Sequence, residues 1–137
     1  MFPRETHILV VDDSLNIRRL VMDSLQKLGF VKITSAEDSI EAITKLQQAL
    51  NSGTPIQLVL SDLNMPGPSG LEFLKQVRST ASFKDLPFLL VTTESEKGAV
   101  IEAAMNGVSG YIVKPFNIET LTRRLKEAYK KHFPDSP

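Results

Sequence analysis

The sequence predicts a doubly wound α/β fold, in which five parallel strands alternate with five helices that cover both faces of the sheet. Short apolar runs rich in branched residues, typical of strands, recur at residues 8–11, 31–34, 56–60, 87–91 and 111–113. The runs are spaced by about the length of one strand–helix unit. Several are apolar at nearly every position, which indicates strands buried on both faces of a parallel sheet.

The first half of the chain contains three of these strands and two helices. ILVV at residues 8–11 is followed by a helical pattern that ends at Gly29, a residue suited to a helix C-terminus. The apolar positions of this helix are Ile17, Leu20, Val21, Leu25 and Leu28. VKIT at residues 31–34 forms the second strand, and a loop at residues 50–55, LNSGTP, leads from the second helix to the third strand, IQLVL at 56–60.

The second half supplies the last two strands, PFLLV at residues 87–91 and YIV at 111–113. We expect Gly107 to end the fourth helix and Asn117 to cap the fifth. The apolar positions of the fifth helix are Ile118, Leu121, Leu125 and Ala128. FPDSP at the end is typical of a frayed tail. We therefore expect one domain over residues 1–137, with a core of about 8–132 and no appended output domain.

The composition disfavours several classes of function. Lys and Arg number 16, and so do Asp and Glu, so no net charge favours nucleic acid or an anionic membrane. The absence of Cys excludes disulfide scaffolds and thiolate chemistry and suits a reducing cytosol. The N-terminal segment matches neither a signal peptide nor a membrane span. We expect a cytoplasmic protein that acts through a local site, without nucleic-acid binding or membrane insertion.

Polar residues follow four of the five predicted strands. Because ligands of an open parallel sheet bind outside the carboxyl ends of its strands, these side chains should converge at one edge. They are Asp12 and Asp13 after the first strand, Ser61 and Asp62 after the third, Thr92, Thr93 and Glu94 after the fourth, and Lys114 and Pro115 after the fifth.

The three aspartates of this set repel one another unless a cation lies among them. Oxygen ligands favour Mg²⁺, or else Mn²⁺, over Zn²⁺. With the charge neutralised, Asp62 can act as a nucleophile toward phosphorus and form an aspartyl phosphate. Lys114 can neutralise one phosphoryl oxygen and the Thr92 hydroxyl can donate to another, so Asp62, Lys114 and Thr92 are the candidate catalytic residues.

Four segments in this order resemble the motifs of the response-regulator receivers of two-component signalling. They are VVDDS at residues 10–14, SDLNMPGPSG at 61–70, VTTE at 91–94 and GYIVKPF at 110–116. The resemblance runs from about Ile8 to His132. It is closest to the free-standing chemotaxis receivers, on the residues Asn64, Met65, Pro66, Glu94 and Tyr111.

The resemblance implies a flavodoxin-like sheet with strand order 2-1-3-4-5, an order already known for a chemotaxis receiver. It implies that Asp12, Asp13, Asp62 and the backbone carbonyl of Asn64 hold Mg²⁺. Asp62 would accept a phosphoryl group from a sensor histidine kinase or a small phosphodonor. The peptide bond before Pro115 would be cis.

The turn after Asp62 and the end of the fourth strand would modulate this chemistry. Gly67, Pro68 and Gly70 form that turn, where glycine permits positive φ and a close approach of the backbone to metal or phosphate. Asn64 and Glu94 would flank the path of the hydrolytic water, and we expect phosphoryl loss in well under an hour. The protein would be a switch with intrinsic autophosphorylation and autodephosphorylation rather than an enzyme that turns over external substrates.

The resemblance also implies an output device. Thr92 and Tyr111 would form a hydroxyl-and-aromatic switch that signals to the surface of the fourth helix, fifth strand and fifth helix. That surface would bind a downstream protein, such as a component of the flagellar motor. A phosphatase or a histidine phosphotransfer domain is a further possible partner.

Three other functions compete with this interpretation. A phosphorelay intermediate would pass its phosphoryl group to a histidine phosphotransfer domain. A phosphatase with an aspartate nucleophile would place a second acid two positions after Asp62, where this chain has Asn64. A flavin or nucleotide binder would have a Gly-rich loop in place of VVDDS.

Two features depart from the chemotaxis receivers. The loop at residues 50–55 is longer, and we expect it to lie away from the site. Thr93 is bulkier than the alanine or glycine often found there, which leaves the rate of phosphotransfer open.

Overall fold

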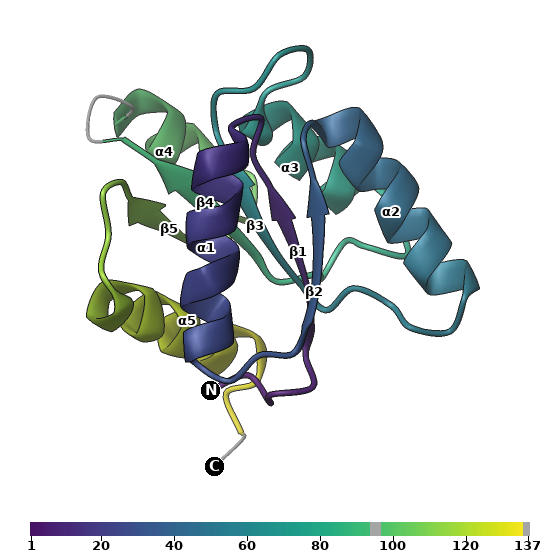
Figure 1. Ribbon diagram of the computed structural model, residues 1–137. Helices are drawn as coiled ribbons and strands as arrows, with labels where there is room; N and C mark the ends of the chain where they lie inside the picture. The colour runs from purple at the N-terminus through teal and green to yellow at the C-terminus, as the bar shows by residue number, and fades with distance from the viewer. Residues whose placement is uncertain (94–96, 136–137) are drawn as a thin grey trace.

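The computed structural model describes residues 1–93 and 97–135, and in them strands and helices alternate (Figure 1). The strands are β1 (His7–Val11), β2 (Lys32–Ala36), β3 (Leu58–Asp62), β4 (Phe88–Thr92) and β5 (Gly110–Val113). The helices are α1 (Leu15–Lys27), α2 (Ser39–Asn51), α3 (Gly70–Ser79), α4 (Lys97–Met105) and α5 (Ile118–His132).

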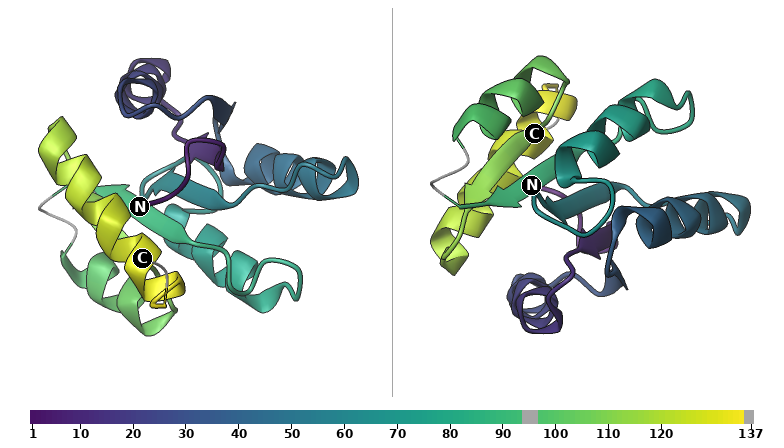
Figure 2. Two further views of the ribbon diagram at one scale, coloured as in Figure 1. Left: turned by 90° about the horizontal axis from the view of Figure 1, so that it is seen from below. Right: turned by 90° about the horizontal axis from the view of Figure 1, so that it is seen from above.

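The five strands form one parallel sheet in the order β2-β1-β3-β4-β5, which confirms the expected order. Figure 2 shows the helices on both faces of the twisted sheet. The helices α1 and α5 cover one face, where buried side chains of the strands pack against Val21, Leu25, Leu121, Leu125 and Ala128. The helices α2, α3 and α4 cover the other face, through Ala42, Leu46, Phe73, Leu74, Val77 and Ala103. The two cores explain why β3 and β4 are buried at every position.

The predicted helix ends are confirmed. Gly29 and Gly107 follow α1 and α4 with φ values of +98° and +80°, a conformation that glycine adopts without steric cost. The side chain of Asn117 accepts a hydrogen bond from the N–H of Thr120 and so caps α5.

Some predicted boundaries and core positions are wrong by a few residues. The second strand lies at 32–36 rather than 31–34, because Val31 precedes the sheet and is 73% exposed. The third strand extends to Asp62, since Asp62 pairs in register with Val91 of β4. Leu20 and Ile118 lie on solvent-facing sides of their helices, at 54% and 37% exposure. Within the described residues, no helix is long and apolar enough to cross a membrane.

Candidate functional site

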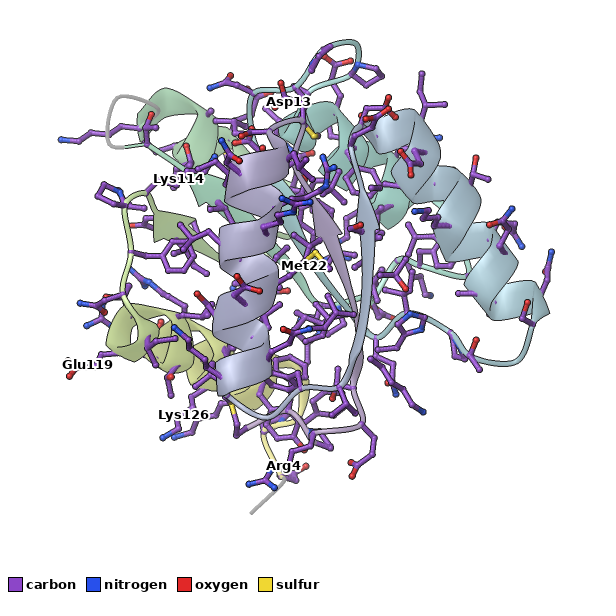
Figure 3. The ribbon with its side chains drawn as sticks, in the orientation of Figure 1. Arg4, Asp13, Met22, Lys114, Glu119 and Lys126 are labelled. Carbon is purple, nitrogen blue, oxygen red and sulfur yellow. The ribbon has the colours of Figure 1, made fainter. Side chains whose placement is uncertain are left out.

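The register of the sheet brings the predicted site residues to one edge. Val11 of β1 is level with Ser61 of β3, so Asp12 and Asp62 are level with each other. On the β4–β5 side of the sheet, the strands continue one residue further. β4 ends at Thr92, and Lys114 follows just beyond the end of β5. Figure 3 shows Asp13 and Lys114 near this edge, close to the start of α1.

The three aspartates form one acidic cluster. Asp12, Asp13 and Asp62 each offer a carboxylate oxygen, and these oxygens lie within 4.8 Å of one another. Asp12 and Asp62 are buried, whereas Asp13 is exposed. A buried pair of carboxylates with a third at the solvent side fits a hard divalent cation that keeps some of its water, as Mg²⁺ does.

Lys114 provides the positive charge of the site. Its Nζ lies 2.9 Å from Oδ1 of Asp62 and 3.3 Å from Oδ2 of Asp12. The Lys114–Pro115 peptide bond is cis, as the resemblance implies. The ammonium group therefore offsets part of the negative charge of the two buried carboxylates.

Backbone groups hold the two buried carboxylates in place. The N–H of Ser14 donates to Oδ1 of Asp12 at 2.9 Å, and the N–H of Leu63 donates to Oδ1 of Asp62 at 2.9 Å. Nη1 of Arg18 donates to the carbonyl oxygen of Asp12 at 2.7 Å. The two N–H bonds fix the carboxylates before any ligand binds, and the Arg18 bond fixes the backbone of Asp12, which lowers the cost of assembling the site.

Burial is the main reason why the pKa of Asp62 lies above its ordinary value, and the charge of Asp12 raises it further. The hydrogen bond and charge of Lys114 oppose this rise without cancelling it. Burial lowers the pKa of Lys114, but the hydrogen bonds and charges of Asp62 and Asp12 outweigh burial and raise it overall. The pKa of Asp62 is higher in the folded chain than in the unfolded chain. Its contribution to stability therefore falls as the pH rises from the unfolded pKa through the folded pKa. A cation among the carboxylates would offset this cost.

The turn after Asp62 contains one contact that no sequence motif indicates and one glycine whose role the motif left incomplete. The Ser39 hydroxyl, at the first residue of α2, donates to the carbonyl oxygen of Pro68 at 2.7 Å and ties this turn to α2. A Cβ atom added at Gly70 would lie 2.1 Å from the carbonyl oxygen of Asp62. Gly70 is therefore required for close packing of α3 on the end of β3. Gly67 is favoured for a different reason, its positive φ of +73°. The chain between Asp62 and α3 carries Asn64, whose side chain is exposed.

The proposed switch residues lie on the neighbouring strands β4 and β5 and line one hollow. Thr92 is buried, and its hydroxyl donates a long hydrogen bond of 3.4 Å to the carbonyl oxygen of Thr93. Tyr111 of β5 is half-buried, and Thr93 is exposed.

Glu94, expected to modulate hydrolysis, lies outside the described residues. The loop predicted at 50–55 lies at 52–57 in the structure, because Leu50 and Asn51 still belong to α2 and β3 starts at Leu58. It lies at the opposite end of the strands from the site, as expected (Figure 1).

Comparisons with known proteins agree with this geometry. A sequence model of the response regulator receiver domain matches residues 8–126. The chemotaxis protein CheY-3 of Vibrio cholerae is 39% identical over 90% of this chain and 92% of its own length. The chemotaxis protein CheY1 of Helicobacter pylori is 40% identical over 87% of this chain and 93% of its own length. The solved structure of the chemotaxis response regulator CheY4 of Vibrio cholerae superposes with a TM-score of 0.79, at 38% identity over 90% of this chain and 98% of that one.

Proposed function

This chain belongs to the response-regulator receiver family of two-component signalling, and from that membership we propose that Asp62 accepts a phosphoryl group in a Mg²⁺-dependent reaction. The observation that carries the proposal is the position of Asp62 in the site. Its carboxylate lies 2.9 Å from the ammonium group of Lys114 and belongs to the cluster whose oxygens lie within 4.8 Å of one another. A nucleophile flanked by a cation and a candidate metal site is what phosphoryl transfer to a carboxylate requires.

In the proposed reaction, a carboxylate oxygen of Asp62 attacks phosphorus in line with the leaving group. The new P–O bond forms as the bond to the leaving group breaks, which is P–N for a phosphohistidine donor and P–O for acetyl phosphate. The electron pair leaves on imidazole or acetate. Bound Mg²⁺, held by Asp12, Asp13, Asp62 and the carbonyl of Asn64, would supply charge neutralisation to the phosphoryl oxygens. Lys114 would neutralise a further oxygen, and the Thr92 hydroxyl would donate to another.

The test is incubation of the protein with acetyl phosphate, followed by intact mass measurement. With Mg²⁺ we expect a gain of one phosphoryl mass, and with the cation chelated by EDTA we expect none. Equal incorporation with and without Mg²⁺ would contradict the proposed role of the acidic cluster.

We propose that the chain acts in chemotaxis, as the names of its relatives suggest, in the cytoplasm with a sensor histidine kinase. The output surface would be formed by α4, β5 and α5, and the downstream partner would be a protein of the flagellar motor. A phosphatase or a histidine phosphotransfer domain would remove the phosphoryl group. Transfer of radiolabel from phosphorylated protein to a histidine phosphotransfer domain, without phosphorylation-dependent motor binding, would favour the relay alternative instead.

Replacing Asp13 with Ala is expected to weaken Mg²⁺ binding by about tenfold or more, because it removes the solvent-side carboxylate of the cluster. In the wild type, Mg²⁺ at about 100 times its Kd should stabilise the fold by about 2.7 kcal/mol. Calorimetry and thermal unfolding in Mg²⁺ measure both effects. The matched control is Asp23→Ala, another exposed aspartate near the same end of the chain. Equal Mg²⁺ affinity in the wild type and Asp13→Ala would refute the metal assignment.

Replacing Thr92 with Ala is expected to leave Asp62 able to accept phosphate but to uncouple it from partner binding. Coupling between two sites typically changes affinity by about 5- to 150-fold, and in the variant the change on phosphorylation should fall below about twofold. Calorimetry with the motor protein, with and without phosphodonor, measures it. Thr93→Ala, next to it and exposed, is the control and should keep the coupling. The role of Thr92 is wrong if its variant couples as strongly as the wild type.

A further inference from the structure

A cation stacks on the proposed switch residue. The guanidinium carbon of Arg124, on α5, lies 4.8 Å from the centre of the Tyr111 ring, on β5. Arginine over the face of an aromatic ring is attracted by the ring quadrupole. Tyr111 is therefore held by a residue that lies outside the acidic cluster.

The hydrogen bonds of Arg124 do not account for its position. Nη1 donates to Oε2 of Glu127 at 3.2 Å, in a pair whose carboxylate is 54% exposed, and such pairs contribute little. Nε is buried and has no hydrogen-bond partner within the part of the chain that the structure describes. A buried N–H group without a partner costs free energy, so the stack on Tyr111 is the contact that favours this placement.

A hollow of about 480 Å³ also borders Tyr111. Its lining includes Thr92, Val100, Tyr111 and Val113. Among the described residues, Arg124 does not line it. The ring thus borders both a cation on α5 and an open space that reaches Thr92.

We propose that Arg124 is a positioning residue that holds the Tyr111 ring out of this hollow. It would thereby set the equilibrium between outward and inward positions of the ring in the unphosphorylated protein. The inference rests on the proposed function, in which Tyr111 turns inward when Asp62 is phosphorylated. Loss of the stack should increase the fraction of molecules in which the Tyr111 ring lies in the hollow. A half-buried cation–π contact would change that equilibrium by roughly three- to tenfold.

The linked prediction concerns phosphorylation. If the inward ring and the phosphorylated site favour each other, a variant that releases the ring must also favour phosphorylation. Arg124→Ala should then reach half-maximal phosphorylation at a roughly three- to tenfold lower concentration of acetyl phosphate. Arg124 lies outside the site itself, so this effect would act through Tyr111 alone.

The deciding experiment is methyl NMR of the unphosphorylated protein, without phosphodonor. Thr92 and Val113 line the hollow, and an aromatic ring that enters it should shift their methyl resonances. We expect these shifts in Arg124→Ala, a smaller change in Arg124→Lys, and none in Arg123→Ala, which changes the adjacent exposed arginine. Glu127→Gln tests whether the ion pair matters and should give only a small change.

A double-mutant cycle separates an effect through the ring from a general loosening of α5. In a Tyr111→Leu background, Arg124→Ala should change neither the Thr92 methyl resonance nor the acetyl phosphate dependence. Unchanged methyl shifts in Arg124→Ala, or equal changes with and without Tyr111, would overturn the inference. Because the NMR measurement needs no phosphorylation, a wild type that takes no phosphate would refute the proposed function and leave the position of the ring to be decided separately.

Discussion

Replacing Asp62 with Asn is expected to abolish phosphoryl incorporation under conditions in which the wild type gains one phosphoryl group. The amide has no carboxylate oxygen to attack phosphorus. Asp62 is 8% exposed, and Asn has nearly the same shape, so the fold should be retained. Intact mass after incubation with acetyl phosphate and Mg²⁺ measures the loss.

The neighbouring aspartates are the obvious substitutes, and the geometry argues against both. Asp12 accepts a hydrogen bond from the Ser14 N–H on one oxygen and contacts Lys114 through the other. Asp13 is exposed and is the solvent-side ligand of the proposed metal site. The control is Asp85→Asn, an exposed aspartate that precedes β4, which should be phosphorylated like the wild type. One phosphoryl mass on Asp62→Asn would show that the acceptor has been misassigned.

Most of the fold could be predicted from the sequence because both faces of the sheet are covered. A strand buried on both sides must be apolar throughout, and β1 and β4 stand out for that reason. The edge strand β2 is mostly half-buried, so its pattern is weak, and its predicted start at Val31 was one residue too early. The end of β3 was missed because Asp62 is polar by composition yet continues the ladder with β4.

The charged part of the site could be predicted for a related reason. In a parallel sheet, residues that follow different strands meet at one edge, so the strand pattern alone predicts that Asp12, Asp62 and Lys114 lie close together. Their closeness is seen in the contacts of Lys114 with both aspartates. Contacts that depend on how two loops or helices approach each other have no such signal. The hydrogen bond from Ser39 to Pro68 joins residues 29 positions apart, and nothing in their local sequence indicates it.

The contact of Gly70 with β3 is another contact that the local sequence does not indicate. The place of Gly70 in the turn predicted positive φ and a close approach of the backbone to metal or phosphate, and did not indicate packing against β3. In the structure the N–H of Gly70 donates to the carbonyl oxygen of Leu63 at 2.8 Å, so α3 begins directly against the end of β3. An added Cβ would lie 2.1 Å from the carbonyl oxygen of Asp62 and 2.9 Å from Cα of Leu63. Both are backbone atoms, which cannot rotate away as a side chain can.

Gly70→Ala is therefore expected to destabilise the fold by about 3 kcal/mol or more, a loss of roughly 10 °C in Tm. The displaced backbone is that of the proposed acceptor, Asp62, so phosphorylation by acetyl phosphate should also slow by roughly tenfold or more in the protein that remains folded. Gly67→Ala is the matched control in the same turn. It has a positive φ of +73° but nothing within 4 Å of the added Cβ, so only backbone strain of about 1 kcal/mol should result. Denaturant unfolding of both variants compares the two costs. If Gly70→Ala is no less stable than Gly67→Ala, then the start of α3 can move away from β3, and Gly70 does not fix the position of Asp62.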